Sequence, residues 1–261
     1  MPDSSPVPDY LSLVRLDGRL VVVLGAGNGI GRQVSHALAQ AGARVVCVDR
    51  EAPLAEFVAG EVAGIPVTAD VTRREEVERV FAEAVAAAPV RGVVDIVGMP
   101  RLGPLRDLDD AGWRWQLDMV LTHAFLAVQI GGQAVAQAGG GSLVFVGSLA
   151  GLATLPGQVA YGAAKAALHH LVAGAARELG PRGVRVNAVA PGFVHTPRLN
   201  SLLSTEQWAQ IDAQIPLGSA AQPAEIAATI LFLSSDLASH VTGQTLSVDG
   251  GVGRNLRLPQ L

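Results

Sequence analysis

Three polar residues near the middle of the chain could together move a proton to or from an oxygen atom. Tyr161 and Lys165 are four residues apart in a helical stretch, so they lie on one face of a helix, one turn apart. Ser148 precedes Tyr161 by thirteen residues and follows a strand-like apolar run. An ammonium favours the phenolate and lowers the tyrosine pKa from about 10, while a serine hydroxyl can bond the substrate oxygen. These residues predict general acid–base chemistry on a carbonyl or alcohol group.

The basic residues of the chain single out Lys165. Of the 19 basic residues, 18 are arginine and Lys165 is the one lysine. A compact ammonium with rotatable donors cannot be replaced by a planar guanidinium, so a lysine here indicates a chemical requirement. Tyr161 is one of two tyrosines, and the other, Tyr10, lies in a proline-rich N-terminal segment. A Y-x-x-x-K pair also arises by chance in ordinary helices, so the surrounding motifs must decide.

Composition argues against several function classes. The net charge is -4 and no basic cluster exists, which disfavours a nucleic-acid partner. The N-terminus lacks a signal-peptide pattern and no apolar run approaches about eighteen residues, so we expect no membrane partner. The single cysteine, Cys47, fits a reducing cytoplasm, and we expect it to be a small core residue. The helical histidines His123, His169 and His170 have no metal-ligand spacing, so we expect no metal.

Apolar runs of strand length alternate with helical patterns from residue 13 onward. We expect residues 1–12 to be a flexible N-terminal tail and residues 13–261 to form a single domain. Alternating strands and helices predict the α/β class, with a doubly wound parallel sheet of about seven strands and helices on both faces. The expected strands are 20–24, 44–48, 65–69, 93–97, 143–146, 184–189 and 245–248. The expected helices are 32–41, 72–87, 110–138, 161–179 and 225–233.

A glycine-rich turn joins the first expected strand to the first helix. Its sequence, from Gly25 to Gly31, is G-A-G-N-G-I-G. Glycines let the backbone turn sharply and approach a pyrophosphate, which the positive end of the helix then favours. The turn alone is a weak signal, but its position after the first strand makes it a strong prediction of a dinucleotide site.

Two carboxylates follow the next strands. Asp49 ends the second strand, where it can accept the ribose hydroxyls of an adenosine and would repel a 2′-phosphate, so it favours NAD over NADP. Arg50, next to it, weakens that inference, although we favour a solvated arginine. Asp70 ends the third strand, where it can cap the following helix or touch the adenine, two roles that are compatible.

Taken in order, these motifs resemble the short-chain dehydrogenase/reductase family over roughly residues 17–252. The resemblance implies a Rossmann-like domain that transfers hydride between a nicotinamide and a carbonyl or alcohol carbon. It makes Tyr161 the acid/base, Ser148 the partner of the substrate oxygen, and Lys165 the group that binds the nicotinamide ribose. It also implies a homotetramer or a dimer. The matching segments are the glycine turn, Asp49, Asp70-Val71, Ser148, Tyr161-x-x-x-Lys165, Asn187 to Gly192 with Thr196, and Val248 to Gly251. The cofactor contacts that we expect are Gly25, Asn28, Gly29, Ile30, Gly31, Asp49, Asp70, Val71, Gly98, Tyr161, Lys165, Pro191, Gly192, Val194 and Thr196.

The chain departs from the family pattern in three places. Leu24 stands where a threonine is usual, Asp95-Ile96-Val97-Gly98 stands for N-N-A-G, and Val120 replaces an asparagine of the long helix. In the family that asparagine helps to shape the helix and place a water that carries protons to the lysine. We therefore hypothesise that this water is held by a backbone carbonyl alone, by Asp95, or by Thr122.

The substrate pocket is expected to form from segments that follow the strands. Its lining leans apolar, which favours a hydrophobic secondary alcohol or ketone, although Arg101 and Arg198 could recruit an acidic group. Residues 195–215 form either a lid over the nicotinamide or a packed surface helix. His195 is more readily a packing residue beside the cofactor than a catalyst. The expected lining residues are Met99, Leu149, Leu155, Gln158, His195, Leu199, Leu202 and Trp208.

The sequence thus predicts a cytoplasmic NAD-dependent oxidoreductase of a hydrophobic secondary alcohol or ketone. An acidic residue at position 49 tilts the direction toward alcohol oxidation. Two alternatives remain open. One is a 3-oxoacyl-type ketoreductase, for which Arg101, Arg106 and Arg198 are the only hints of a carrier-protein patch. The other is a non-catalytic dinucleotide-binding sensor, which the changes at Asp95 and Val120 suggest.

Overall fold

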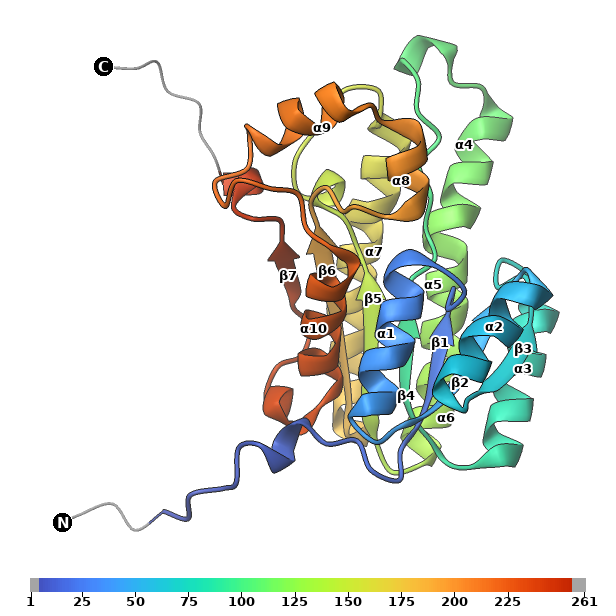
Figure 1. Ribbon diagram of the computed structural model, residues 1–261. Coiled ribbons are helices and arrows are strands. Elements are labelled where there is room, and N and C mark those ends of the chain that lie inside the picture. The colour runs from blue at the N-terminus through green and yellow to red at the C-terminus, as the bar shows by residue number, and fades with distance from the viewer. Residues whose placement is uncertain (1–4, 255–261) are drawn as a thin grey trace.

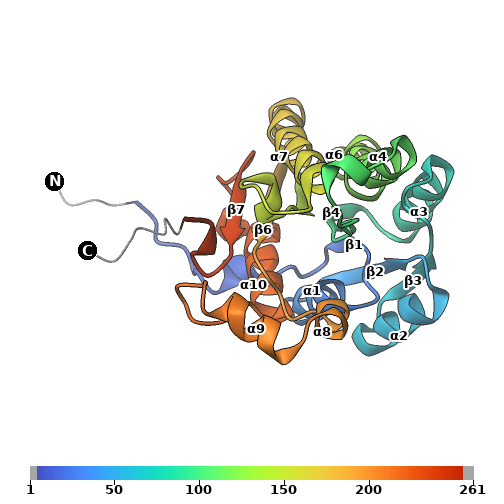
Figure 2. The same cartoon turned by 90° about the horizontal axis from the view of Figure 1, so that it is seen from above.

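The computed structural model describes residues 5–254 and places a seven-stranded parallel sheet between two layers of helices (Figures 1 and 2). The strand order is β3-β2-β1-β4-β5-β6-β7. The first three strands are added in one direction across the sheet, and from β4 onward the strands are added on the other side of β1. The predicted fold class is confirmed. The strands are β1 (Leu20–Leu24), β2 (Arg44–Asp49), β3 (Ile65–Thr68), β4 (Val90–Asp95), β5 (Gly141–Val146), β6 (Val184–Pro191) and β7 (Thr245–Val248).

Helices cover both faces of the sheet. Seen from above, α1, α2 and α10 lie on one side, and α3, the long α4–α6 helix and α7 lie on the other (Figure 2). The main helices are α1 (Gly29–Gln40), α2 (Ala52–Val62), α3 (Arg74–Ala87), α4 (Asp110–Leu117), α5 (His123–Leu126), α6 (Gly132–Gln137), α7 (Val159–Leu179), α8 (Pro197–Leu202), α9 (Thr205–Asp212) and α10 (Pro223–Ser234).

Two hydrophobic cores form because alternate residues of each strand face opposite layers. Along β1, Leu20, Val22 and Leu24 join the core beneath α3 and α7, whereas Val21 and Val23 join the core beneath α1 and α10. All five are buried. Cys47 is buried in the second core, as predicted.

Two elements differ from the sequence prediction. Strand β4 begins at Val90 and ends at Asp95, three residues earlier than expected at its start and two at its end. The helix α2 was not predicted. Pro53 stands in its first turn, where a missing N–H costs nothing, and Ala63 ends it in the left-handed conformation at φ 50°.

The long helix over residues 110–137 is continuous but changes its winding twice. Residues Asp118–Thr122 and Ala127–Gly131 are π-helical, and α4, α5 and α6 are the α-helical parts between and around them. By length and composition this helix could cross a membrane, but half of its most apolar window is buried inside the domain. It packs on α3 and α7 as a core helix.

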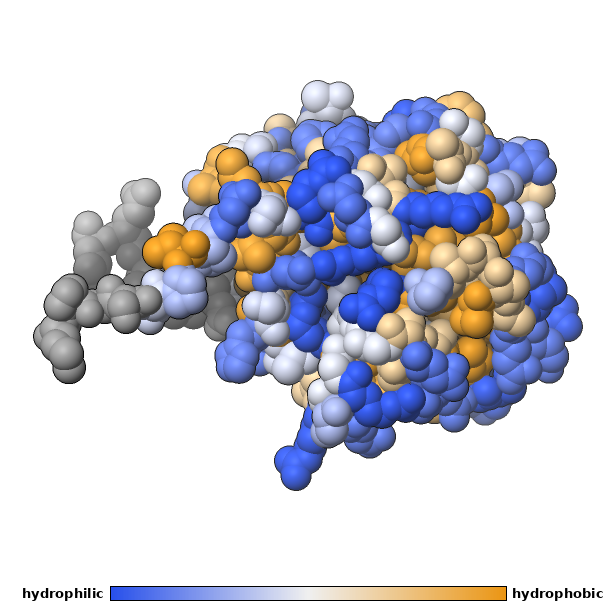
Figure 3. Space-filling view, turned by 90° about the horizontal axis from the view of Figure 1, so that it is seen from below, coloured by the Kyte–Doolittle hydropathy of each residue, from blue (hydrophilic) through white to orange (hydrophobic). Residues whose placement is uncertain are grey.

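The described chain begins with a short segment outside the sheet and its covering helices. Residues 5–11 are exposed and precede a single 3₁₀ turn at Ser12–Val14. The predicted tail 1–12 and domain 13–261 include residues 1–4 and 255–261, which lie outside the described part of the chain. At the face formed by the amino ends of the strands, hydrophilic residues alternate with apolar ones (Figure 3).

Candidate active site

Ser148, Tyr161 and Lys165 meet at the carboxyl ends of β5 and β6. β5 ends at Val146, and Ser148 follows in extended conformation as the cap of a 3₁₀ turn, where its Oγ accepts the Ala150 N–H at 3.1 Å. α7 begins at Val159, so Tyr161 lies in its first turn and Lys165 one turn later. The Ser148 side chain lies near enough to Tyr161 to act on the pKa of its hydroxyl.

Lys165 is the anchor of this group. Its side chain is 1% exposed, and its Nζ donates to the Val146 carbonyl at 2.7 Å and lies 5.7 Å from the centre of the Tyr161 ring. Burial lowers the pKa of Lys165 to about 8, and the Asp95 carboxylate acts in the opposite direction. With this pKa, Lys165 remains mainly protonated at neutral pH but loses its proton far more readily than an ordinary lysine.

The pKa of Tyr161 differs from the sequence expectation. It is raised above its ordinary value, because burial disfavours the phenolate, and the Ser148 side chain offsets only part of this effect. The expected lowering by Lys165 is not found; its ammonium lies 5.7 Å from the centre of the Tyr161 ring and donates to the Val146 carbonyl.

The glycine turn is shaped for a close approach of backbone atoms. Gly25 has φ 83°, and its N–H, like that of Ala26, donates to the Val48 carbonyl at 2.9 Å. A Cβ on Gly31 would lie 1.9 Å from the Gly25 carbonyl oxygen, so no larger residue fits between turn and helix. Asn28 caps α1 by accepting the Gly29 N–H at 2.8 Å.

Both predicted carboxylates lie beside this turn. The Asp49 oxygens accept backbone N–H groups, from Gly27 at 2.9 Å and from Glu51 at 3.1 Å. Arg50 is exposed, as expected of a solvated arginine, and its nearest ion-pair partner is Glu51 at 4.0 Å. Asp49 is therefore fixed at the rim of the turn by the backbone itself.

Asp70 does not cap the following helix, contrary to one of the two predicted roles. α3 begins at Arg74, two residues later than expected, with Arg73 as its cap residue. Asp70 instead accepts the Thr72 N–H at 3.0 Å and the Thr72 hydroxyl at 2.7 Å. These bonds lower the pKa of its carboxyl group.

A cleft of about 580 Å³ lies between the glycine turn, the carboxylates of Asp49 and Asp70, and the loop after β4. This volume is within the size range of small-molecule sites. Its inner end reaches Gly98, where an added Cβ would lie 2.7 Å from the Lys165 Nζ. The cleft therefore runs from the carboxylate of Asp49 to the base of the Lys165 site. It brings together the predicted cofactor residues Gly25, Asn28, Asp49, Asp70, Val71 and Gly98, with Met99, Trp115, Asp118 and Met119 also in the wall.

The remaining predicted cofactor residues lie around the other side of the turn. Thr196 caps α8 by accepting the Leu199 N–H, and a Cβ on Gly29 would lie 3.6 Å from Thr196. The start of α8 thus covers the glycine turn. Gly192 donates to the Val248 carbonyl, which fixes the end of β6 beside β7. The space left by the glycines beside the Asp49 carboxylate fits a dinucleotide pyrophosphate and ribose.

The predicted substrate residues fall into separate groups at the same end of the sheet. His195 stacks on Trp208 with ring centres 4.0 Å apart, and its Nδ1 lies 3.1 Å from the Asn200 Oδ1. Leu199 packs with Trp208 in a small cluster apart from the two main cores. Leu149 is buried beside Gly253. Leu155 and Gln158 flank Gly157, whose carbonyl accepts the Gly103 N–H, and Met99 lies in the cofactor cleft, while Leu202 is exposed.

Residues 195–215 form two short helices rather than one. α8 and α9 are separated at Leu203 and Ser204, and Ser204 with Gln207 forms a capping box for α9. Trp208 is 9% exposed and packs on Ile215 and Ala220. This segment has its own small hydrophobic cluster, so it is packed as a unit.

Sequence reasoning gave no role in the site to three residues at this end of the sheet. Gln116 is buried and holds the loop after β4, with its Nε2 on the Met99 carbonyl and its Oε1 on the Arg101 N–H. His123 binds Asp95. His169, one turn after Lys165, faces the backbone of Ser148, and burial and the nearby ammonium lower its pKa to about 4. A polar residue on the apolar side of a helix was the available signal for all three.

The structure bears on the three groups hypothesised to hold the relay water, which are a backbone carbonyl, Asp95 and Thr122. The Thr122 hydroxyl donates to the Asp118 carboxylate at 2.9 Å on the exposed side of the helix. The Asp95 carboxylate is already bonded to His123 and to the Val97 N–H. Val120 is fully buried within the π-helical turn and offers no side-chain polar group. The helix keeps its irregular winding without the asparagine.

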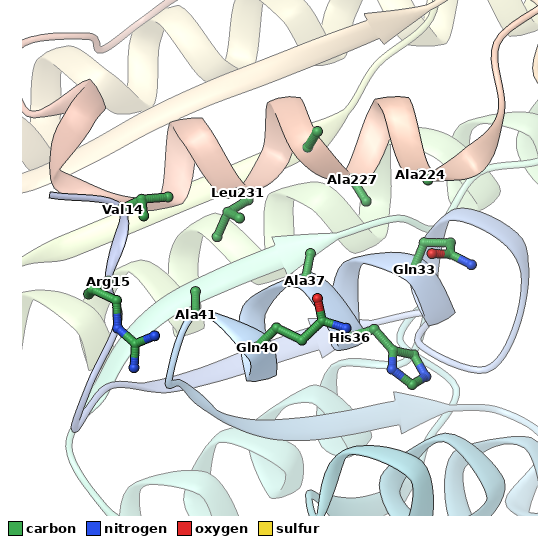
Figure 4. Close-up of a pocket in the computed structure, with 11 residues that line it drawn as sticks. Val14, Arg15, Gln33, His36, Ala37, Gln40, Ala41, Ala224, Ala227 and Leu231 are labelled. Carbon is green, nitrogen blue, oxygen red and sulfur yellow. The ribbon is translucent and has the colours of Figure 1, made fainter. Parts of the chain in front are cut away.

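Two other hollows contain none of the predicted site residues. One lies between α1 and α10 beside the first 3₁₀ turn and is lined by aliphatic side chains, two glutamines, Arg15 and His36 (Figure 4). The other lies among the glycine-rich turns at the amino ends of the strands, where Arg91 and Arg185 donate to the carbonyls of Ala138 and Leu233. Within residues 5–254, no three carboxylate, imidazole or thiol groups gather as metal ligands.

The fold and this cleft define a dinucleotide-binding oxidoreductase. Residues 25–253 match the family described as enoyl-(acyl carrier protein) reductase. A galactitol 2-dehydrogenase (L-tagatose-forming) of Cereibacter sphaeroides is 40% identical over 93% of this chain and 98% of its own. The solved 7α-hydroxysteroid dehydrogenase with NADH and 7-oxo glycochenodeoxycholic acid is 31% identical with TM-score 0.88, over 93% of this chain and 97% of its own. A gluconate 5-dehydrogenase from Burkholderia cenocepacia with NADP and tartrate is 28% identical with TM-score 0.88, over 94% and 99%.

This chain belongs to the short-chain dehydrogenase/reductase family. It is accordingly an oxidoreductase of the CH–OH group that uses a nicotinamide cofactor. Relatives with NADH and with NADP both occur, so the preferred cofactor is a separate question.

Proposed function

We propose that the protein is an NAD(H)-dependent oxidoreductase that interconverts a secondary alcohol and a ketone, with Tyr161 as the acid/base. The observation that carries this proposal is the convergence of Ser148, at the end of β5, with Tyr161 and the buried ammonium of Lys165 one helical turn later on α7. In oxidation, Ser148 would hold the alcohol oxygen and the phenolate form of Tyr161 would take its proton, while a bound oxidised nicotinamide would accept the hydride. Reduction reverses these steps.

The preference for NAD is proposed from Asp49. Its carboxylate lies at the end of β2 in the cleft and is fixed by the Gly27 and Glu51 N–H groups. A fixed carboxylate can bind the ribose hydroxyls and repels a 2′-phosphate. Arg50 is exposed beside it, so we expect the Asp49 charge to set the preference between NAD and NADP. An NAD-linked enzyme is expected to run toward alcohol oxidation.

The substrate is proposed to be a hydrophobic secondary alcohol, because the buried Leu149 and the Leu199–Trp208 cluster give this end of the sheet an apolar surface. A second candidate is a polyol, which the name of the galactitol 2-dehydrogenase relative favours. Gln158, His195 and Asn200 offer polar groups for it. A 3-oxoacyl carrier-protein substrate is less well supported, since Arg101 and Arg106 already lie near Asp109 and Asp107.

One experiment separates these readings. Binding of NADH and NADPH is measured by fluorescence titration, and turnover is then screened with hydrophobic secondary alcohols and with four- to six-carbon polyols. Tighter NADH binding with turnover supports the proposal, and the active panel identifies the substrate class. Tight NADH binding without turnover in either panel would favour the non-catalytic sensor.

We also propose a homotetramer or a dimer in the cytoplasm. Trp113 and Phe125 on the long helix are 40% and 42% exposed, which is unusual for aromatic side chains in a monomer. Light scattering after size-exclusion chromatography gives the oligomeric state, and a monomer at micromolar concentration would contradict this part.

A further inference from the structure

Two groups of opposite charge are buried beneath the proposed site, and the Asp95 carboxylate acts on the Lys165 ammonium. Within residues 5–254, Asp95 is the only buried carboxylate and Lys165 the only buried ammonium, each 1% exposed. Removing an ion from water costs several kcal/mol unless a partner compensates for it. The two groups are therefore expected to depend on each other.

The strand register places Asp95 beside the end of β5, the strand whose last residue binds Lys165. Asp95 ends β4 and pairs in register with Phe145 of β5, and the next residue, Val146, accepts the Lys165 ammonium. The chain after Asp95 then turns back, because its Oδ1 accepts the Val97 N–H at 3.0 Å. This turn delivers Gly98 to the Lys165 Nζ.

His123 completes the arrangement from the long helix. Its Nδ1 lies 2.7 Å from the Asp95 Oδ2, and the two side chains are 1% and 0% exposed. Its Nε2 is buried and has no hydrogen-bond partner in the described part of the chain. With Asp95 ionised and Lys165 protonated, a neutral imidazole that donates from Nδ1 keeps this buried set free of net charge, whereas an imidazolium would add a charge.

We propose that Asp95 and His123 form a positioning pair that keeps Lys165 protonated, with Asp95 as its counter-charge and His123 as the donor that orients the carboxylate. The inference deepens the proposed function, because the charge of Lys165 matters only if Tyr161 is the acid/base. The other titratable groups beside Lys165 are Tyr161 and His169, both on α7, and neither can supply a negative charge at neutral pH.

The effect of this pair has a definite sign. Asp95 raises the pKa of Lys165 against the lowering by burial, so loss of the carboxylate leaves burial unopposed. Asparagine is a fitting substitute, since it keeps a carbonyl oxygen for the Val97 N–H and removes the charge, while its NH2 can donate to the Nδ1 of His123 in the other tautomer.

The test uses the fact that Lys165 is the only lysine in the chain. Protein grown with [¹³Cε]lysine gives one side-chain signal, and its chemical shift titrates with the Lys165 pKa directly. We expect Asp95→Asn to lower that pKa by at least about one unit, which is about tenfold in the protonation equilibrium. His123→Leu should lower it by about half a unit, and His123→Asn, which keeps an N–H for Asp95, should restore it.

Controls keep the result interpretable. Thr122→Val changes the neighbouring exposed residue and should leave the Lys165 pKa as in the native protein. Thermal melts and NADH binding check that each variant is folded. If Asp95→Asn does not fold, the comparison of His123→Leu with His123→Asn decides. An unchanged Lys165 pKa in the folded variants overturns the pairing, whatever the enzyme does.

The kinetic readout is separate from the NMR result. In alcohol oxidation, Asp95→Asn should move the acid limb of the kcat profile to higher pH while the KM for NAD stays constant. Shifted lysine titration without any turnover in the native protein would support the pair and contradict the proposed function. An unchanged lysine titration in Asp95→Asn, together with turnover by the native protein, would contradict the pair and support the proposed function.

Discussion

The Lys165 Nζ donates a 2.7 Å hydrogen bond to the carbonyl oxygen of Val146, the last residue of β5. This bond ties α7 to the strand that delivers Ser148, so the helix carrying Tyr161 and the loop carrying Ser148 share one frame. Arginine could not replace this contact, because its planar fork is larger and directs its donors differently. The choice of the one lysine at this position thus has a geometric reason as well as an electrostatic one.

Replacing Tyr161 with phenylalanine should remove the acid/base while leaving the ring in place. We expect kcat to fall about 10²- to 10⁴-fold, the usual contribution of a positioned acid or base. NADH affinity should change little, since the substitution removes one hydroxyl. Steady-state kinetics and fluorescence titration measure the two effects. Tyr10→Phe, in the exposed N-terminal segment, is the matched control. Retained turnover in Tyr161→Phe would show that another group moves the proton.

Replacing Asp49 with serine should relax the choice of cofactor. The substitution removes the carboxylate that would repel a 2′-phosphate, so we expect the ratio of NADH to NADPH affinity to fall by about tenfold or more. The ratio is measured by parallel titrations. Arg50→Ala is the control, and it should shift the ratio in the opposite direction or leave it unchanged. If the native ratio already favours NADPH, the Asp49 interpretation is wrong.

Most of the fold follows from the sequence because buried strands and amphipathic helices leave different periodicities. The β-branched run at Leu20–Leu24 and the glycine turn after it give both position and direction of the first unit. The helix α2 was not predicted because its apolar residues are not concentrated on one side of the helix. Boundaries such as the start of β4 depend on pairing with β1 and β5, which periodicity does not record.

The site was predictable only in part, for a physical reason. Ser148, Tyr161 and Lys165 carry a local spacing, and the sequence shows it. The Asp95–His123 contact joins residues 28 positions apart on different elements. Likewise, the raised pKa of Tyr161 is a consequence of burial, which becomes known only when the surrounding atoms are placed.

Placing asparagine at Val120 tests whether the missing family residue limits the enzyme. Val120 is fully buried inside the π-helical turn, so an amide there displaces apolar packing. We expect a loss of about 1–3 kcal/mol in the free energy of unfolding and no gain in kcat, because Asp95 and His123 already support Lys165. Urea unfolding and the kcat profile give both quantities. A large gain in kcat would show that proton transfer in the native chain is impaired.

Lys165 should make stability depend on pH in an alkaline window. Its pKa is about 8 in the folded protein against an ordinary 10.5, so the unfolded chain holds this proton more readily between these values. Folding is therefore penalised below pH 8, and the penalty is relieved as the pH rises to 10.5. Relative to Lys165→Met, the native free energy of unfolding should rise by about 2–3 kcal/mol across the window. Urea unfolding of both proteins at several pH values measures it, and parallel pH dependences would contradict the lowered lysine pKa.

Gly31→Ala should disrupt the turn that we assign to the cofactor pyrophosphate. The new Cβ would lie 1.9 Å from the Gly25 carbonyl oxygen, so the turn or the start of α1 must move. We expect a loss of more than about 2 kcal/mol in the free energy of unfolding, and weakened NADH binding in the protein that still folds. Gly60→Ala is the matched control, because nothing lies within 4 Å of its added Cβ and alanine favours the helix by about 0.5–1 kcal/mol. Thermal melts and NADH titrations compare the two. Equal NADH affinity in folded Gly31→Ala would place the pyrophosphate away from this turn.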